Sequence, residues 1–175
     1  MLCSGWWDDA RSARGMWDMG ESVTMTGSGV PVVLRAEHLS AIARHGEATY
    51  PEECCGILLG NEADGARVIE RLVPIDNQWA SVDRGERFLI GPRDVLGAER
   101  EARRSGLDVL GFYHSHPDSP ARPSEFDREH AWPWYTYLII SIVAGNAGQL
   151  NGWQLRDDRS GYDVVALSEC ASVVG

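Results

Sequence analysis

Lysine is absent from this 175-residue chain, and all sixteen of its basic residues are arginine. The absence excludes a phosphate-binding P-loop, a Schiff-base lysine and a serine–lysine dyad, because each of these chemistries requires a lysine amine. Acidic residues outnumber the arginines at 26 to 16, which gives a formal net charge of −10 at pH 7. Nucleic-acid binding requires basic patches that displace counterions, so we predict no nucleic-acid partner.

Long apolar runs are also lacking. The longest, from Trp132 to Gly145, is interrupted by Pro133 and Thr136 and is too short to span a bilayer, which predicts no membrane association. The first 30 residues contain three of the seven tryptophans without any periodicity, and they have no basic segment followed by an apolar one. We therefore predict a disordered leader over residues 1–30 rather than a secretory signal, and a single domain over residues 31–175.

Cysteine is scarce, and the four residues do not form a disulfide framework. Cys54 and Cys55 are adjacent in an apolar run typical of a strand, so their side chains point to opposite faces and neither pair easily nor bind one zinc ion together. Their simplest role is that of small buried core residues. The alternative is a nucleophilic Cys55 paired with His114, but no basic neighbour is evident to lower the pKa of the thiol. This cysteine usage favours a reducing cytoplasm.

The most informative segment is HSHPDSPARPSEFD, which runs from His114 to Asp127. His114 and His116 follow an apolar stretch that suits a buried strand, and residues two apart on a strand point to the same face. Pro123 and Ser124 are typical of a helix start, which places Ser124 and Asp127 on one helical face. Two imidazoles and one carboxylate leave the fourth position of a tetrahedral ion open, as in a catalytic zinc site. The ordinary alternative is a pair of surface histidines beside a helix cap.

Two adjacent glutamates stand before a second apolar run, in the segment YPEECCGILLG (residues 50–60). Glu53 is next to the buried run, where desolvation would raise the pKa of its carboxyl toward the range of a general base. Glu52 is one residue further from the run, and we expect it to be solvated. Of the pair, Glu53 is therefore the candidate for acid–base chemistry.

Three histidines remain outside these motifs. His38 and His45 fall within the first expected helix, where solvated positions are the simplest interpretation. His130 stands three residues after Asp127, from where it could support the site, but an ordinary polar contact is the commoner role. None of the three is assigned to the site.

Hydrophobic periodicity and turn residues predict an α/β fold with a mixed sheet flanked by helices, because strands and helices alternate irregularly along the chain. A second helix is expected between Pro92 and Gly106, and a short third helix should start at Ser124. The first expected helix covers residues 36–49. Expected strands are residues 54–59, 67–74, 87–90, the histidine-bearing segment from residue 108, 135–143, 149–156 and 162–167.

The two motifs together resemble the complete JAMM motif of the MPN-domain metalloproteases. The family pattern is a glutamate shortly before a glycine, then H-[ST]-H-P, then a serine and an aspartate at fixed offsets. Every position is filled here with the family spacing, and the resemblance extends over roughly residues 32–168. It implies a curved mixed β-sheet flanked by helices, of the MPN/JAB, cytidine-deaminase-like type. The matching residues are Glu53, Gly56, His114, Ser115, His116, Pro117, Ser124 and Asp127.

The resemblance also implies a zinc metallopeptidase of the isopeptidase or deubiquitinase type. His114, His116 and Asp127 would hold the Zn²⁺ ion. Glu53 would act as general base toward the attacking water, and Ser124 would donate a hydrogen bond to the oxyanion.

The chain resembles the compact bacterial members of the family. Little sequence follows Asp127, and the segment between Glu53 and His114 leaves little room for insertions that grip ubiquitin. Such members process small ubiquitin-like sulfur-carrier proteins at their C-terminal Gly-Gly, so we expect a partner of this kind. The alternatives are a non-catalytic MPN scaffold subunit, although no ligand of the motif is missing, and a general zinc peptidase. No oligomeric state is predicted.

Overall fold

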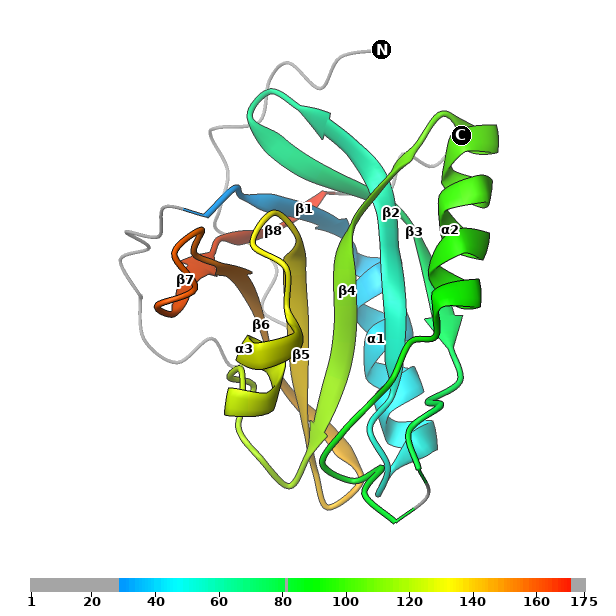
Figure 1. Ribbon diagram of the computed structural model, residues 1–175, viewed down its shortest axis with the longest axis vertical. Coiled ribbons are helices and arrows are strands. Elements are labelled where there is room, and N and C mark those ends of the chain that lie inside the picture. Colours follow the sequence, from blue (N-terminus) through cyan, green and yellow to red (C-terminus); the bar gives the residue numbers. More distant parts are fainter. Residues whose placement is uncertain (1–28, 81, 171–175) are drawn as a thin grey trace.

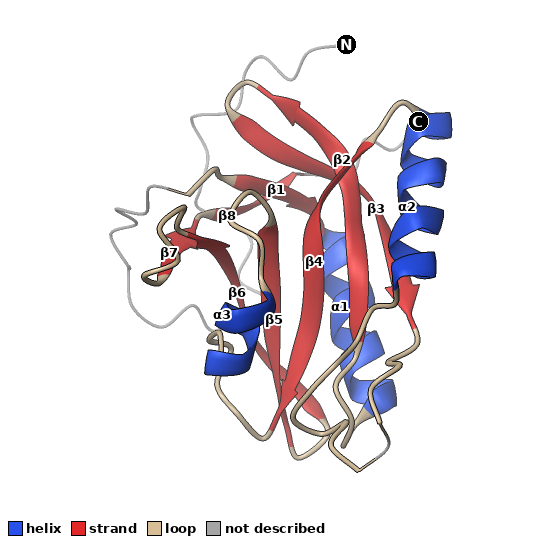
Figure 2. Ribbon diagram, in the orientation of Figure 1, coloured by secondary structure: helices blue, strands red, loops and turns tan. Residues whose placement is uncertain are grey.

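The computed structural model describes residues 29–80 and 82–170, and in this part of the chain one eight-stranded mixed sheet forms the frame (Figure 1). Residues 1–28 lie outside it, and with them almost all of the expected leader. The strands are β1 (Val32–Arg35), β2 (Cys55–Ala63), β3 (Ala66–Ile75), β4 (Asp108–Pro117), β5 (Thr136–Val143), β6 (Asn146–Leu155), β7 (Tyr162–Val165) and β8 (Leu167–Cys170). The helices are α1 (Ala36–Thr49), α2 (Pro92–Ser105) and α3 (Glu125–His130) (Figure 2).

The sheet curls because its two outer strands are consecutive in the chain. The strand order is β7-β6-β5-β4-β2-β3-β1-β8, so Ala166 alone carries the chain from one end of this order to the other. Val32, at the start of β1, donates a backbone hydrogen bond to the Ala166 carbonyl at 2.8 Å. β8 then pairs with β1 in parallel. The curved mixed sheet expected from the sequence is confirmed.

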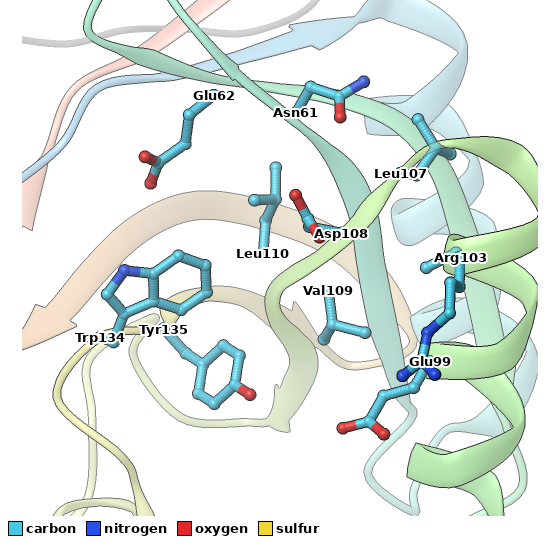
Figure 3. A pocket seen from close by; sticks show the side chains of 11 residues that line it. Asn61, Glu62, Glu99, Arg103, Leu107, Asp108, Val109, Leu110, Trp134 and Tyr135 are labelled. Carbon is cyan, nitrogen blue, oxygen red and sulfur yellow. The ribbon is translucent and has the colours of Figure 1, made fainter.

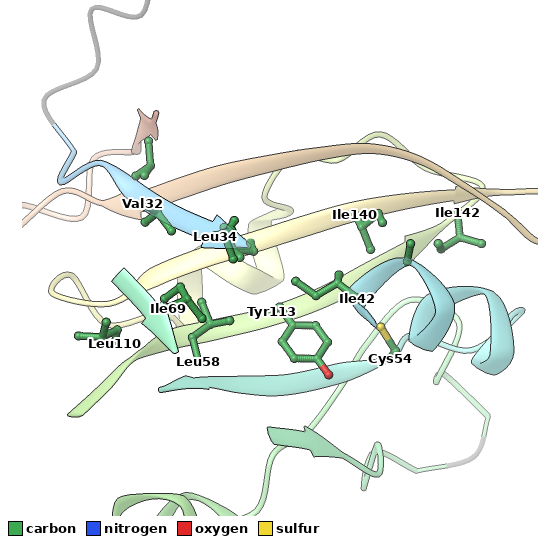
Figure 4. Close-up of a cluster of buried hydrophobic side chains, with 13 residues drawn as sticks. Val32, Leu34, Ile42, Cys54, Leu58, Ile69, Leu110, Tyr113, Ile140 and Ile142 are labelled. Carbon is green, nitrogen blue, oxygen red and sulfur yellow. The ribbon is translucent and has the colours of Figure 1, made fainter. Parts of the chain in front are cut away.

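The largest cluster of buried apolar side chains lies between α1 and one face of the sheet (Figure 4). Ile42 and Ala43 of α1 pack there with strand residues such as Leu58 and Ile140, all of them buried. Each fully buried leucine or isoleucine side chain contributes about 1.5–3 kcal/mol to the free energy of folding. The main core therefore lies on this face of the sheet, and the opposite face is available for packing by the other two helices.

The helices α2 and α3 lie on the opposite side of the sheet from α1 (Figure 1). Two buried alanines of α2, Ala98 and Ala102, pack against fully buried aliphatic residues of β2. The helix begins at Pro92 and is followed by Gly106 with φ of 67°, a left-handed conformation that glycine adopts at little cost. Both boundaries agree with the prediction. No helix in the described residues is long and apolar enough to cross a bilayer.

The strand β4 occupies the middle of the sheet and sets the direction of the motif side chains. It pairs antiparallel with β2 and parallel with β5. Tyr113 belongs to the core beneath α1, and Ser115 faces Gly46 of α1. Because side chains alternate along a strand, His114 and His116 project from the other face, where α2 and α3 lie.

Two expectations about strands differ from the structure. Residues 87–90 form a loop and not a strand, because the side chain of Asn77, rather than a neighbouring strand, bonds the Arg87 carbonyl and the Leu89 N–H. The strands β1 and β8 were not expected. Each has only four residues, which is too short for a period of two to be distinguished from chance.

The expectation that His38 and His45 are solvated is also wrong. His38 is 6% exposed, and its Nδ1 accepts a hydrogen bond from the backbone N–H of Arg35 at the start of α1. His45 is half-buried, and its Nδ1 lies 2.9 Å from the hydroxyl of Tyr113. Burial lowers the pKa of both imidazoles, which favours their neutral forms. The partner of His38 is local, whereas the partner of His45 is supplied by β4 through the tertiary fold.

Candidate metal centre and active site

The structure brings the three predicted metal ligands together. His114 and His116 stand two residues apart on β4, and their Nε2 atoms are 3.0 Å apart. Asp127 enters from α3, with Oδ1 at 3.3 Å from Nε2 of His114 and Oδ2 at 3.5 Å from Nε2 of His116. Among the described residues this is the one group of three or more potential ligands whose donor atoms all converge, within 4.8 Å of one another.

The spacing of these atoms fits a tetrahedral ion. Ligand atoms bound to zinc at 2.0–2.1 Å in tetrahedral directions lie about 3.3 Å from one another. The two separations that involve Nε2 of His114, 3.0 Å to Nε2 of His116 and 3.3 Å to Oδ1 of Asp127, lie close to this value. Nitrogen and oxygen donors are also the ligands that such an ion accepts. The residues present therefore fit a divalent metal ion with one coordination position left open.

Neighbouring groups orient two of the ligands. Nδ1 of His116 lies 3.0 Å from the Pro120 carbonyl and must donate to it, which leaves the lone pair on Nε2 for the cluster. Oδ2 of Asp127 accepts hydrogen bonds from both the backbone N–H and the hydroxyl of Ser124, each at 2.7 Å. Oδ1 is then the oxygen that turns toward His114. These supports fix the donor atoms before any ion binds.

His114 is held by packing. Its ring is 1% exposed and stacks on Phe88, with 4.6 Å between the ring centres and 27° between the planes. Its Nδ1 is buried and has no hydrogen-bond partner among the described residues. Burial lowers the pKa of His114, which favours the neutral ring, in which Nε2 can offer a lone pair.

Glu53 and Glu52 occupy different environments, as the sequence predicted. Glu53 is 5% exposed, and its Oε1 lies 4.0 Å from Nε2 of His116. Burial, with the negative charge of Asp127 adding to it, raises the pKa of Glu53 to about 8, against the opposing influence of His116. Glu52 is nearly half exposed and pairs with Arg84 at 3.6 Å, on the outside of the loop. Only Glu53 therefore faces the cluster.

The carboxylate of Asp127 favours a cation at the cluster. Burial alone would raise the pKa of Asp127, but His114, His116 and the Ser124 hydroxyl outweigh it and hold this pKa well below its usual range. Burial would likewise lower the pKa of His116, but the hydrogen bond to Asp127 and the charge of Glu53 raise it instead. Buried carboxylates require a partner charge or a metal ion.

The candidate serine is bonded to the candidate aspartate. Ser124 is the N-cap of α3: its hydroxyl donates to Oδ2 of Asp127 and accepts from the Asp127 backbone N–H at 3.1 Å. This capping box is the local reason that the helix begins where the sequence predicted. Ser115, between the two histidines, faces the other side of β4, where its hydroxyl accepts the Cys54 N–H at 2.8 Å.

The buried thiols do not favour the alternative of cysteine nucleophilic catalysis. Cys55 is fully buried, and its Sγ faces the Ile75 carbonyl at 3.5 Å. Burial raises the pKa of Cys55 to about 12 and that of Cys54 to about 11. A reactive thiol requires the opposite shift. His130 also lies outside the cluster, because its Nδ1 bonds to the Phe126 carbonyl and its ring stacks on Phe126 at 4.1 Å.

The contacts with the site that the sequence did not predict come from the loop between β3 and α2. Phe88 stacks on His114, as described above, and Trp79 packs edge-to-face on Phe126 of α3 at 5.2 Å. Asn77 bonds to the backbone carbonyl of Glu53 at 3.1 Å. No local pattern in the sequence of this loop indicates contact with a metal ligand.

A surface pocket of about 600 Å³ lies elsewhere on the same face (Figure 3). Its lining includes Asn61 at the end of β2, Arg103 of α2, Val109 of β4 and Trp134 before β5. A strand rises about 3.3 Å per residue, so Val109 is roughly 16 Å along β4 from His114. The pocket is therefore separate from the ligand cluster.

The curved sheet, its helices and the His–His–Asp cluster define the JAB/MPN class of protein. A family model described as prokaryotic homologs of the JAB domain matches residues 35–156. The chain therefore belongs to the prokaryotic JAB family, which confirms the JAMM/MPN resemblance read from its motifs.

Relatives of this chain include a protein named as a desampylase and one named as a peptidase. The desampylase of Haloferax volcanii is 38% identical over 101 residues, which cover 57% of this chain and 70% of that protein. The CysO-cysteine peptidase of Mycobacterium tuberculosis is 29% identical over 132 residues, or 72% of this chain and 84% of that protein. A solution structure of a Desulfitobacterium hafniense protein matches with a TM-score of 0.71 and 30% identity, covering 82% of this chain and 95% of that one.

Proposed function

We propose that this protein is a zinc-dependent peptidase that hydrolyses the peptide or isopeptide bond after the C-terminal Gly-Gly of a small ubiquitin-like sulfur-carrier protein. The observation that carries the proposal is the convergence of His114, His116 and Asp127 beside the buried carboxyl of Glu53. Three protein ligands with one open position characterise catalytic rather than structural zinc. The names of the related desampylase and CysO-cysteine peptidase support the substrate class.

The proposed mechanism assigns one task to each side chain. A zinc ion held by His114, His116 and Asp127 would supply Lewis acidity that activates water and polarises the scissile carbonyl. Glu53 accepts the proton of the attacking water and delivers it to the leaving amine. A raised pKa suits both steps, because the same carboxyl must take up and release a proton near neutral pH.

Ser124 is the proposed hydrogen-bond donor to the oxyanion that develops on the substrate carbonyl. Its single hydroxyl proton is directed to Asp127 in the structure, so this role requires the hydroxyl to turn toward substrate. The backbone N–H of Ser124 keeps its own bond to Asp127 during such a turn. The ligand can therefore stay oriented while the hydroxyl changes partner.

A Gly-Gly tail suits a centre whose ligands are so deeply buried. His114 is 1% exposed and His116 is 8% exposed, so only a chain without bulky side chains can bring its carbonyl close to them. A non-catalytic scaffold is the less supported alternative, because all three ligands and the adjacent glutamate are retained in one cluster. A general peptidase remains the competing hypothesis.

The test uses sulfur-carrier homologues from the same genome with native, Gly→Ala and Gly→Val tails at the penultimate position. Intact mass spectrometry should detect cleavage after the native Gly-Gly, with rates lower by orders of magnitude for the two variant tails. The Glu53→Gln variant serves as the inactive control. Equal cleavage of all three tails, or cleavage of unstructured peptides alone, would identify a general peptidase instead.

A further inference from the structure

The loop between β3 and α2, residues 76–91, spans the candidate site; we call it the site loop, and residue 81 within it lies outside the described residues. At one point Phe88 stacks on the ligand His114. At another, Trp79 packs on Phe126, the residue before the ligand Asp127. The carbonyl of Arg84 accepts the backbone N–H of Glu53 at 2.7 Å. The loop thus touches the proposed base and the surroundings of two ligands.

One side chain, Asn77, organises this loop. Its Nδ2 donates to the carbonyl of Glu53 at 3.1 Å and to the carbonyl of Arg87 at 2.9 Å. Its Oδ1 accepts the backbone N–H of Trp79 at 3.0 Å and of Leu89 at 3.2 Å. An asparagine amide has two N–H donors and two acceptor lone pairs, so all four positions are used. The amide closes the loop upon itself and fastens it to Glu53.

We infer that Asn77 is a positioning residue that fixes Glu53 relative to the metal ligands. The inference rests on the function proposed above, because it concerns the same base. Both backbone polar groups of Glu53 are bonded to the site loop, its N–H to Arg84 and its carbonyl to Asn77. The loop in turn reaches the ligands through Phe88. The side chain of Glu53 has no hydrogen bond to a described residue that would orient it independently.

The chemistry of the four bonds requires an amide of this length. Aspartate has nearly the same shape, but its carboxylate cannot donate and would place negative charge against two carbonyl oxygens. Alanine removes the bonds without adding charge and leaves the backbone groups of Trp79, Arg87 and Leu89 without this partner. In either case the loop loses its bond to Glu53, and the carboxyl is no longer held at its distance from His116.

The experiment compares Asn77→Asp with a matched substitution elsewhere. Asn146 is the first residue of β6, and its Nδ2 bonds to the Ala144 carbonyl in the preceding turn at 3.0 Å, so Asn146→Asp makes the same chemical change away from the site. We expect kcat to fall about a hundredfold in Asn77→Asp with KM changed by less than about threefold, because misplacement of a reacting group affects the chemical step. Zinc content should stay near one per chain.

A second readout is independent of activity. Hydrogen exchange followed by mass spectrometry should be faster in Asn77→Asp for the amide of Glu53 and for peptides from the site loop, and unchanged in Asn146→Asp. Asn77→Ala gives the same comparison if the aspartate variant does not fold. Wild-type kcat in both Asn77 variants, unchanged exchange, or loss of zinc would overturn the inference. If the wild-type protein cleaves no carrier, the proposed function fails, while exchange still decides whether Asn77 holds the loop to Glu53.

Discussion

Ser124 and Asp127 bond to each other in both directions: the serine hydroxyl donates to Oδ2 of the aspartate, and the aspartate N–H returns a bond to the same hydroxyl. The pair is at once the start of α3 and the support of a metal ligand. Ser124→Ala should therefore weaken two properties together. Loss of the cap should cost about 1 kcal/mol of stability. Zinc affinity should fall about tenfold to a hundredfold, because the support of Asp127 is halved.

Competition with a chelating dye and urea unfolding measure the two effects of Ser124→Ala. Ser119→Ala is the control, since Ser119 is an exposed residue of the same segment. A variant that lost stability but bound zinc like the wild type would show that Ser124 serves α3 alone.

The three ligands should account for the bound metal. Purified protein should contain close to one zinc per chain by elemental analysis, and His116→Ala or Asp127→Ala should lose it, since two remaining ligands make a weak site. His130→Ala should retain the metal, because His130 bonds to Phe126 outside the cluster. Unchanged zinc in the His116 variant would eliminate the centre as described.

The two adjacent glutamates should respond differently to the same substitution. Glu53→Gln should keep the metal and the fold but reduce turnover by about 10²–10⁴-fold, because an amide cannot accept the proton of water. Glu52→Gln should remain close to wild type, since Glu52 only pairs with Arg84 at the surface. Steady-state kinetics on a carrier substrate measure both, and reversed effects would refute the assignment of the base.

The buried thiols should resist alkylation over an unusually wide pH range. With a pKa of about 11, Cys54 is about one part in a thousand thiolate at pH 8, and Cys55, with a pKa of about 12, is less ionised still. Because these pKa values are raised, the thiolate forms only at higher pH. Mass spectrometry after iodoacetamide treatment at pH 8 should find both unmodified in the folded protein and modified in urea. Rapid labelling of Cys55 in the folded protein would contradict this prediction and support the alternative of a nucleophilic Cys55.

Gly56 should tolerate no side chain, because an added Cβ would lie 2.2 Å from Cε1 of Tyr113 in the next strand. Gly56→Ala should destabilise the protein by about 1–3 kcal/mol through overpacking. Gly97→Ala is the matched control: a Cβ there meets nothing within 4 Å, and its position inside α2 predicts a gain of up to about 1 kcal/mol. Denaturant unfolding of both variants tests the contrast.

Local geometry explains why the convergence of His114, His116 and Asp127 could be predicted from sequence. Side chains two residues apart on a strand point to the same face, and so do side chains three residues apart on a helix. Both rules hold independently of the tertiary fold. His114 and His116 follow the first rule, and Ser124 and Asp127 follow the second. The position of Glu53 followed from its place at the edge of an apolar run.

The site loop could not be predicted in the same way. Its backbone is bonded by the side chain of Asn77, and its order depends on contacts with Glu53, His114 and α3 that are distant in sequence. Residues 87–90 resemble a short strand in sequence because Phe88, Leu89 and Ile90 form an apolar run. Buried His38 was missed for a related reason: its partner is a backbone group, which leaves no sign in the sequence.

The three proposed ligands lie on elements of unequal stability, which affects how the metal ion binds and dissociates. Two ligands stand on β4, which is bonded to a strand on each side, while the third stands on the six-residue α3. Short peripheral helices open far more often than central strands. Local unfolding of α3 would remove Asp127 from the site and leave His114 and His116 in place as a two-ligand site. The ion should thus arrive and depart on the timescale of a fraying helix, while the sheet stays folded.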